Sequence, residues 1–298
     1  MSRVFVTGVN GFAGRYIAAA LARTGHEVHG LVKPPHSGDI PGVSQIYEAD
    51  LNDTEALKRI IDAAQPNKIV HLAAIAFVAH GNVKDVYDTN VLGTRSLLEA
   101  LAHQGVSYDA VMLMSSANVY GNKTAGRLNE RTPLNPVNDY ALSKLAMEYL
   151  THIFSNMPFI IVRPFNYTGI GQDKNFIIPK IIDHAKRKAR SLELGNIDVA
   201  RDFSDVRFVA DCCQRLLDAP DAIGQIVNIC SGIPYRLIDV IDSIENISDH
   251  HFEITKNSSL MRNNEVLQLW GDPSKLHNLI GAADAPPFSD TLRWMLEA

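Results

Sequence analysis

The chain has 298 residues, of which 46% are hydrophobic and 20% charged, so it is long enough for a globular protein with a large core. Its 28 lysines and arginines against 33 aspartates and glutamates give a net charge of −5, which excludes a basic field of the kind that collects nucleic acid. The opening apolar run is too short for a signal peptide, and no later run approaches a membrane span. We therefore expect a cytoplasmic protein that binds neither nucleic acid nor a membrane.

Cysteine and histidine patterns give no signal for disulfides or metals. The three cysteines, Cys212, Cys213 and Cys230, form neither an even disulfide framework nor the spacing of a zinc site. The eleven histidines are scattered along the chain. We expect buried or idle thiols and no metal cofactor.

The chain begins with a predicted strand, a glycine turn and a helix. A β-branched and aromatic run over residues 3–7 precedes Gly8-Val9-Asn10-Gly11-Phe12-Ala13-Gly14, and a helical apolar pattern follows. The three glycines permit a tight turn, a close backbone approach to a pyrophosphate and close packing of helix on strand, with the helix N-terminus facing the anion. The spacing differs from the Gly-x-Gly-x-x-Gly of ordinary dehydrogenases and is by itself a weak indication of a dinucleotide site. Its place between strand and helix favours a dinucleotide site.

The ends of the next two predicted strands concern the adenosine half of such a cofactor. The strand at 27–32 ends at Lys33, where an NAD-preferring unit usually has an acidic residue. A lysine there suits a 2′-phosphate, which favours NADP(H) over NAD(H), although a solvated lysine at a strand end explains it equally well. The strand at 45–49 is followed by Asp50 and Leu51, and this carboxylate is placed to accept a hydrogen bond from an adenine amino group.

Strands and helices alternate up to residue 166, which predicts an α/β fold with a Rossmann-like, doubly wound parallel sheet. The further predicted elements are a helix at 53–64, a strand at 68–74, a helix at about 83–103 that carries Asn90, a strand at 109–114, a helix at 139–154 and a strand at 159–162. We expect a dinucleotide-binding domain over 1–166 and a smaller, mainly substrate-binding part over 167–298. Elements at about 200–230, such as a strand at 225–229, should return to the main sheet.

Several polar residues follow these strands or lie on these helices. Ser115 and Ser116 come directly after the strand at 109–114, at the edge where open parallel sheets bind ligands, although helix-capping serines are the alternative. Tyr140 and Lys144 are four positions apart on one predicted helix, so their side chains share a face. A nearby ammonium lowers the pKa of a phenol, which would let Tyr140 exchange a proton with a substrate oxygen near neutral pH.

Two arginines in the later part of the chain have small polar surroundings. Arg201 follows a strand-like run, and Arg262 lies in a late loop near Glu265. Guanidinium groups bind a nucleotide diphosphate bidentately, which is the role we expect. Exposed arginines in surface ion pairs are an equally good alternative.

Six motifs follow one another in the order found in one enzyme family. They are the glycine turn, Asp50, His71-Leu72-Ala73-Ala74, Ser115-Ser116, Tyr140-x-x-x-Lys144 and Arg163-Pro164-Phe165-Asn166. With them the chain resembles, over nearly its whole length, the extended short-chain dehydrogenase/reductases that act on nucleotide sugars. The resemblance implies that Tyr140 is the acid/base and that Lys144 holds the nicotinamide ribose and tunes Tyr140. It also implies that Ser116 hydrogen-bonds the reacting oxygen.

The same resemblance implies the binding residues and the assembly. Its cofactor-binding positions are Gly8, Asn10, Gly11, Phe12, Gly14, Lys33, Asp50, Leu51, Leu72, Ala73, Ala74, Asn90, Tyr140, Lys144 and Pro164. Its positions for the nucleotide-sugar substrate are Ser116, Asn166, Arg201, Arg262 and Glu265. Related enzymes often dimerise through the two helices predicted here at 83–103 and 139–154, so we expect a homodimer.

The segment between Ser116 and Tyr120 bears on the reaction. The 4,6-dehydratases that resemble this chain carry a glutamate where Asn118 stands, often preceded by an aspartate where Ala117 stands. The epimerase-reductases that make GDP-fucose carry a cysteine at the position of Asn118. Because this chain has neither these carboxylates nor the cysteine, the expected reaction is simple oxidation or reduction at one carbon of the sugar. Runs at 163–172, 194–206 and 228–232 look like the GDP-6-deoxy-4-keto-D-mannose reductases, except that Tyr167 stands where a histidine is expected.

This resemblance implies reduction of the C4 keto group of GDP-4-keto-6-deoxy-D-mannose to GDP-D-rhamnose, or a close relative, by NAD(P)H. A nucleotide-sugar 4-epimerase with tightly bound NAD is the alternative. A non-catalytic NADP(H)-sensing regulator is a remote one, because such proteins tend to lose the catalytic tyrosine, and this chain has both Tyr140 and Lys144. No motif reads out the nucleotide base or distinguishes a rhamno from a talo product.

Overall fold

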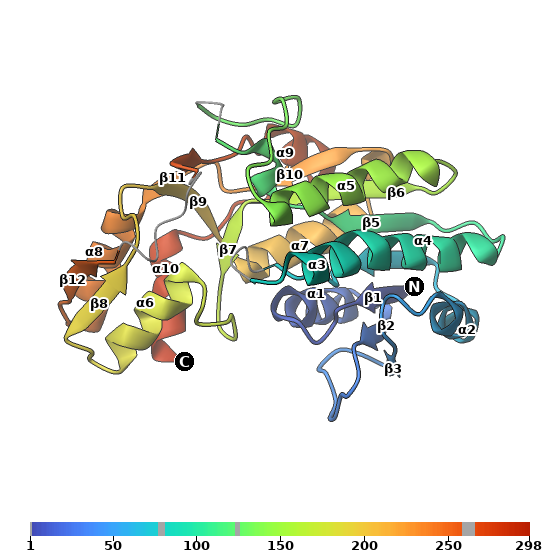
Figure 1. The fold of residues 1–298 in the computed structure, drawn as a ribbon, viewed down its shortest axis with the longest axis horizontal. Coiled ribbons are helices and arrows are strands. Elements are labelled where there is room, and N and C mark those ends of the chain that lie inside the picture. The colour runs from blue at the N-terminus through green and yellow to red at the C-terminus, as the bar shows by residue number, and fades with distance from the viewer. Residues whose placement is uncertain (1, 77–80, 123–125, 258–265) are drawn as a thin grey trace.

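The structure, a computed structural model, describes residues 2–76, 81–122, 126–257 and 266–298. Within these residues a parallel sheet of seven strands in the order β10-β6-β5-β4-β1-β2-β3 has helices on both faces, and a smaller part lies beside it (Figure 1). The strands are β1 (Arg3–Thr7), β2 (Glu27–Val32), β3 (Gln45–Glu48), β4 (Lys68–His71), β5 (Ala110–Met114), β6 (Phe159–Pro164) and β10 (Ile226–Ile229). The predicted doubly wound α/β fold is therefore confirmed.

Two hydrophobic cores lie on the two faces of this sheet. Along β1, Val4 and Val6 point into one core and Phe5 into the other, as the two-residue period of a strand requires. Helices α1, α7 and α9 cover the first core, and α2, α4 and α5 cover the second. Their bounds are α1 (Phe12–Arg23), α2 (Thr54–Ala64), α4 (Thr94–His103), α5 (Asp139–Ile153), α7 (Val206–Leu217) and α9 (Ser274–Ile280). Burial on both faces explains why the strands read as continuous apolar runs.

Two predicted elements end or break where polar groups intervene. The strand predicted at 68–74 ends at His71, because the N–H groups of Leu72 and Ala73 donate to the Thr7 hydroxyl, each at 3.2 Å. The helix predicted at 83–103 consists of α3 (Val83–Tyr87), a wider π-helical turn η1 (Asp88–Gly93) and α4. Such turns are frequent at functional sites, and this one contains Asn90.

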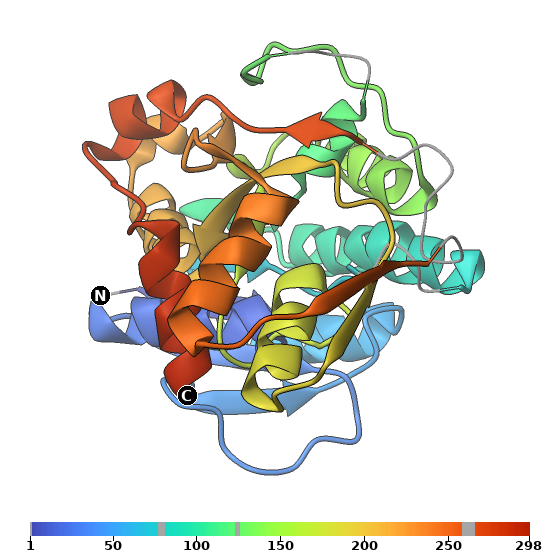
Figure 2. The ribbon, with the colours of Figure 1, turned by 90° about the vertical axis from the view of Figure 1, so that its left-hand side faces the viewer.

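The smaller part comes mainly from the later chain and has its own core. Its strand β9 pairs with β7, β11 and β13, while β8 pairs with β12. Figure 2 faces this part and shows α6, α8 and α10 in the foreground. The bounds are β7 (Asn166–Thr168), β8 (Ser191–Leu194), β9 (Ala200–Asp205), β11 (Pro234–Arg236), β12 (Glu253–Lys256), β13 (Gln268–Leu269), α6 (Ile177–Lys186), α8 (Leu237–Ser248) and α10 (Phe288–Glu297). Two short 3₁₀ helices, η2 (Ala117–Tyr120) and η3 (Pro220–Ala222), complete the described elements. None of the helices described here is both long and apolar enough to cross a membrane.

A chain of buried polar side chains links β1 and β4 of the main sheet to α4. The Thr94 hydroxyl donates to the Asn90 carbonyl at 2.8 Å, so its oxygen is left to accept from His71 Nε2, also at 2.8 Å. His71 Nδ1 then accepts from the Thr7 hydroxyl at 2.7 Å. These bonds require a neutral imidazole with its proton on Nε2.

Replacement of His71 by glutamine should remove a pH dependence of stability. Burial, and secondarily the Lys144 ammonium, lowers the pKa of His71 from 6.5 to about 3. Between these values the unfolded chain binds a proton at His71 and the folded chain does not. The free energy of unfolding therefore falls as the pH falls through this window, by up to about 1.4 kcal/mol per pH unit from this group.

Urea unfolding between about pH 7 and pH 4 measures this slope in the wild type and in His71→Gln. The variant should have the shallower slope, whatever its absolute stability. His103→Gln, at the exposed end of α4, is the control and should follow the wild type. Equal slopes for wild type and His71→Gln would contradict the assignment.

Candidate active site

The glycine turn between β1 and α1 has the close packing expected of a pyrophosphate cradle. A Cβ on Gly14 would lie 2.3 Å from the Gly8 carbonyl oxygen, and one on Gly8 would lie 2.8 Å from the Ala73 Cα. Gly8 also has a φ of +67°, which favours glycine. Helix α1 starts after Gly11, which offers no side chain to cap the first N–H groups. Those N–H groups and the helix dipole suit a bound diphosphate, so these residues fit a dinucleotide.

Phe12, the first residue of α1, belongs to an aromatic cluster that reaches the C-terminal helix. Its ring stacks on that of Tyr167 at 5.9 Å and meets the edge of Tyr16 at 5.7 Å. Tyr16 in turn meets Trp294 of α10 at 6.2 Å, and the guanidinium of Arg207 lies 3.7 Å over the Trp294 ring. The cluster holds the glycine turn against both β7 and α10.

The two residues predicted for the adenosine end lie together. Lys33 Nζ is 3.1 Å from Asp50 Oδ2, and both side chains are substantially exposed. Hydrogen bonding from the Asn52 backbone, together with Lys33, keeps the pKa of the Asp50 carboxyl below its usual value. Leu51 packs under Gly93, where a Cβ would lie 2.7 Å from its side chain.

Asn90 joins the segment after β4 to the helix that bears Tyr140. Its side chain accepts from the Ile75 N–H at 2.8 Å and donates to the Ile75 carbonyl at 3.1 Å. It also donates to the Ser143 hydroxyl at 2.9 Å. The run from Leu72 to Ala74 is thus held between Thr7 and Asn90, beside the glycine turn.

The three predicted catalytic residues lie at the carboxyl end of β5. Lys144 on α5 is buried, and its ammonium donates to the Met114 carbonyl at 2.8 Å. Burial lowers the pKa of Lys144 to about 8, although the Glu148 carboxylate opposes the shift. Ser116 caps the N-terminus of η2 and hydrogen-bonds Tyr140, which counters in part the rise that burial causes in the pKa of Tyr140.

The direction of the Tyr140 pKa differs from the expectation drawn from the Tyr-x-x-x-Lys spacing. We expected the ammonium of Lys144 to lower it, whereas burial of the phenol raises it and the Lys144 ammonium is directed at the Met114 carbonyl. Tyr140 is consequently held as a neutral phenol, the form that donates a proton.

The predicted substrate residues are only partly within the described chain. Asn166 on β7 pairs in register with Phe203 on β9, and Arg201 lies two residues earlier on β9, so both belong to one strand pair. Arg201 donates to the Ala200 and Leu267 carbonyls at 3.0 and 3.1 Å. Arg262 and Glu265 lie outside the described residues. Pro164 ends β6, two positions before Asn166.

Sequence reasoning missed how neighbouring buried side chains support these residues. A buried group of Ser115, Tyr120, Glu148, Arg163 and Asn228 lies directly behind the catalytic residues. The role of Glu148 could have been found, because it lies one turn after Lys144 on a predicted helix, and that of Arg163 because it directly follows the strongly apolar predicted strand at 159–162. The partnership of Tyr120 with Asn228 has no local sequence signal.

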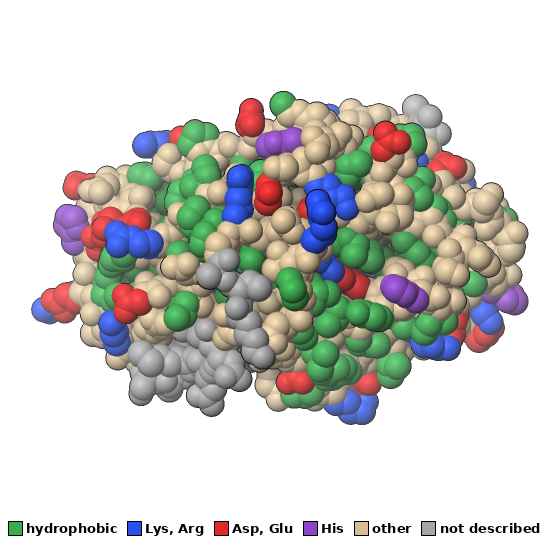
Figure 3. Space-filling model, turned by 90° about the horizontal axis from the view of Figure 1, so that it is seen from above, with side chains coloured by type: hydrophobic (Ala, Val, Ile, Leu, Met, Phe, Trp, Pro, Cys, Tyr) green, Lys and Arg blue, Asp and Glu red, His purple; other side chains and the backbone are tan. Residues whose placement is uncertain are grey.

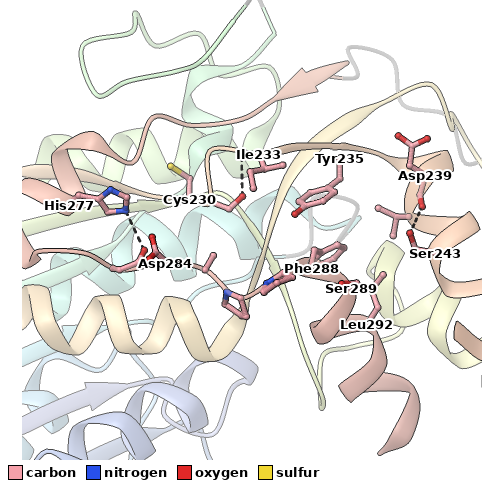
Figure 4. Close-up of a pocket in the computed structure, with 16 residues that line it drawn as sticks. Cys230, Ile233, Tyr235, Asp239, Ser243, His277, Asp284, Phe288, Ser289 and Leu292 are labelled. Carbon is pink, nitrogen blue, oxygen red and sulfur yellow. Dashed lines mark hydrogen bonds between the residues drawn. The ribbon is translucent and has the colours of Figure 1, made fainter.

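Two of the hollows among the described residues differ in their relation to the catalytic group. A cavity of about 470 Å³ lies among α8, α9 and α10, with Tyr235, Phe288 and His277 in its lining (Figure 4). None of the predicted catalytic or cofactor residues lines it. A shallower hollow of about 580 Å³ lies at the start of α5 and is lined by Asn138 and Asp139, directly before Tyr140. Among the described histidines, cysteines and acidic residues, no group of three is arranged to hold a metal.

Comparison with known proteins identifies the family. Residues 4–230 match the NAD dependent epimerase/dehydratase family. A GDP-6-deoxy-D-talose 4-dehydrogenase from Aggregatibacter actinomycetemcomitans is 32% identical over 280 residues, covering 94% of this chain and 91% of that protein. A GDP-6-deoxy-D-mannose reductase from Pseudomonas aeruginosa is 32% identical over 306 residues, covering 99% of this chain and 96% of that protein.

A solved structure extends the likeness to the fold over the full chain. The structure of RMD from Pseudomonas aeruginosa complexed with NADPH has a TM-score of 0.85 at 31% identity, covering 100% of this chain and 98% of that chain. The glycine turn, Ser116, Tyr140 and Lys144 stand at one edge of the sheet in the present structure. The chain therefore belongs to the NAD dependent epimerase/dehydratase family and is an NAD(P)-dependent enzyme of the extended short-chain dehydrogenase/reductase type.

Proposed function

We propose that this protein is a nucleotide-sugar reductase that converts the C4 keto group of GDP-4-keto-6-deoxy-D-mannose to the hydroxyl of GDP-D-rhamnose. The observation that carries the proposal is the placement of Ser116, Tyr140 and Lys144 at one sheet edge. Ala117 and Asn118, which follow Ser116, supply no carboxylate or thiol there. The two GDP-sugar relatives, a 4-dehydrogenase and a reductase, act by their names on 6-deoxy sugars. They support this substrate class.

Tyr140 is the proton donor in this proposal. A phenol of ordinary pKa is already protonated near neutral pH, and burial raises the pKa of Tyr140 further. The bound nicotinamide supplies the hydride that reduces the carbonyl. As charge develops on the sugar oxygen, Tyr140 gives its proton to that oxygen, and Lys144 is proposed to hold the nicotinamide ribose beside it.

Ser116 is suited to act beside Tyr140 as a hydrogen-bond donor. Its oxygen accepts two bonds from Asn118, from the backbone N–H at 3.2 Å and from the side-chain amide at 3.1 Å. The hydroxyl proton is thereby left for the reacting oxygen or the Tyr140 phenol. Asn118 orients Ser116 in this arrangement, in place of the carboxylate that would remove a proton during dehydration.

The later part of the chain is proposed to bind the sugar nucleotide. Arg201 and Asn166 on the β7–β9 pair, with Arg262 and Glu265, would hold its phosphates and ribose. The product is written as rhamno on the resemblance to the reductases. Carbon-13 and proton NMR of the product separates rhamno from talo directly.

Replacement of Tyr140 by phenylalanine should abolish most of the turnover. We expect kcat to fall by about 10²–10⁴-fold, the usual worth of a positioned proton donor, with cofactor affinity nearly unchanged. Nicotinamide absorbance loss measures this after addition of GDP-4-keto-6-deoxymannose made in situ by a dehydratase. Tyr149→Phe, on an exposed position of the same helix, is the control.

A wild-type kcat in Tyr140→Phe would contradict the assignment of Tyr140 as the proton donor. If the wild type consumes neither NADPH nor NADH, yet carries NAD and interconverts sugar nucleotides, the enzyme is a 4-epimerase and the proposed reaction is wrong.

We propose NADP(H) as the preferred cofactor because Lys33 stands beside Asp50 at the adenosine end. Lys33→Ala should lower kcat/KM for NADPH about tenfold or more, since a charge-assisted bond to a 2′-phosphate is worth about 1.5–3 kcal/mol. The value for NADH should not change. Lys58→Ala, on the neighbouring α2, controls for loss of surface charge. A parallel loss with both cofactors would contradict the 2′-phosphate role.

We also propose a homodimer in the cytoplasm, where free thiols such as the three buried cysteines persist. Large apolar side chains are exposed along α5, at Leu142, Tyr149 and Ile153, and on the adjacent η1 at Leu92. Figure 3 looks down on the side where α5 lies in Figure 1, and a patch of hydrophobic side chains occupies its lower middle. Continuous apolar patches of this kind mark interfaces.

Ile153→Glu should convert the dimer to a monomer, because it would bury a carboxylate in that interface. Light scattering at micromolar concentration measures the mass. Ile223→Glu, an exposed apolar site after η3 in the part of the chain that follows α7, should remain dimeric. A monomeric wild type would refute the dimer.

A further inference from the structure

A chain of buried polar side chains runs behind the catalytic residues and crosses four elements. Glu148 on α5 accepts from Arg163 Nε at 2.9 Å and from Arg163 Nη2 at 2.6 Å, and it also accepts from the Ser115 hydroxyl. Arg163 Nη1 donates to the Tyr120 hydroxyl at 3.1 Å. The Tyr120 hydroxyl donates to the Asn228 side-chain oxygen at 2.7 Å. The chain thus joins the ends of β5, β6 and β10 to α5 and η2.

The members of this chain are almost fully enclosed. The side chains of Arg163 and Glu148 are 2% and 5% exposed, and Tyr120 is fully buried. Arg163 also lies over the Tyr120 ring, 5.1 Å from its centroid. Burying a carboxylate and a guanidinium is costly, and apolar residues of similar size would usually serve stability as well. The arrangement therefore calls for a reason other than stability.

That reason lies at the two ends of the Ser115–Glu148 bond. Ser115 directly precedes Ser116, the proposed donor to the substrate oxygen. Glu148 lies one helical turn after Lys144, whose ammonium it faces across the buried side of α5. One carboxylate thus contacts the residue beside one catalytic group and acts electrostatically on another.

We propose that Glu148 is a positioning residue, and that the Ser115–Glu148–Arg163–Tyr120 chain fixes Ser116 and Lys144 relative to each other for proton transfer. The proposal deepens the proposed function and rests on it. Arg163 holds both oxygens of the carboxylate in one orientation, and the Tyr120 hydroxyl, itself bonded to Asn228, accepts from Nη1 of the guanidinium. Glu148 consequently cannot rotate without breaking its bonds to Ser115, directly after β5, and to Arg163 on β6.

The charges around Lys144 give the proposal a direct physical readout. Tyr140 and Glu148 lie on its own helix, His71 faces it from β4, Arg163 stands behind Glu148 on β6, and β5 presents the Met114 carbonyl. His71 is neutral and Arg163 is cationic. Glu148 is the anion of this group, and it opposes the fall that burial causes in the pKa of Lys144.

The first experiment titrates Lys144 itself and needs no substrate. Protein labelled with carbon-13 at the lysine ε position gives one resonance per lysine, and Lys144→Arg identifies the one to follow. Glu148→Gln should lower the measured pKa of Lys144 by about one unit or more, because an adjacent opposite charge shifts a pKa by that amount. Ser115→Ala keeps the carboxylate but removes a donor from it, and should move the value upward.

The second experiment separates positioning from folding. Ser115→Ala and Tyr120→Phe each remove one hydroxyl and leave the ion pair intact, so they test the chain even if Glu148→Gln does not fold. Each should lower kcat about tenfold or more while KM changes less than twofold, since small misplacements of catalytic groups act on turnover. Glu99→Gln, an exposed ion-pair partner on α4, is the control and should match the wild type in both readouts.

The outcomes are distinguishable. An unchanged Lys144 titration in both Glu148→Gln and Ser115→Ala overturns the proposal, as does unchanged kcat in folded Ser115→Ala and Tyr120→Phe. If the titration shifts as expected but the wild type does not reduce the keto sugar, the positioning role stands and the proposed function is the part that fails.

Discussion

The missing side chain at Gly14 is the constraint on which the rest of the site depends. A Cβ there would lie 2.3 Å from the Gly8 carbonyl oxygen, so only glycine lets α1 approach the end of β1 this closely. The approach places the N-terminus of α1 at the carboxyl edge of the sheet, and it brings Phe12 against Tyr167 of β7. Gly8 makes the matching contact with Ala73, which fixes the segment after β4 on the other side. The turn is therefore shaped by contacts with three strands.

Electrostatics at the same edge follow from the burial of Lys144. Burial, and secondarily the nearby Lys144 ammonium, keeps the imidazole of His71 neutral, and two threonine hydroxyls hold it. On the opposite side Glu148 supplies the negative charge, and Arg163 compensates Glu148 in turn. The edge thus holds, in this order, a neutral imidazole, an ammonium, a carboxylate and a guanidinium. Burial keeps the phenol of Tyr140 neutral within this arrangement.

The sequence was enough to predict the elements that depend on local pattern. The alternation of apolar strands and helices, the glycine turn and the four-residue spacing of Tyr140 and Lys144 each have a period or spacing that can be read directly. What could not be read depends on partners far apart in the chain. Tyr120 meets Asn228 across 108 positions, and the π-helical turn at Asn90 forms where that side chain binds Ile75 and Ser143. The rise in the Tyr140 pKa likewise depends on how completely the fold encloses the phenol, which no spacing records.

The aromatic cluster makes the first turn of the chain dependent on its last helix. Trp294 of α10 packs on Tyr16, which packs on Phe12 at the glycine turn, while Thr291 of the same helix donates to Asp205 at 2.9 Å. During synthesis on the ribosome the turn emerges well before these partners. The nucleotide cradle is therefore completed only after α10 has emerged, so the order of translation delays formation of the finished site until this helix is available.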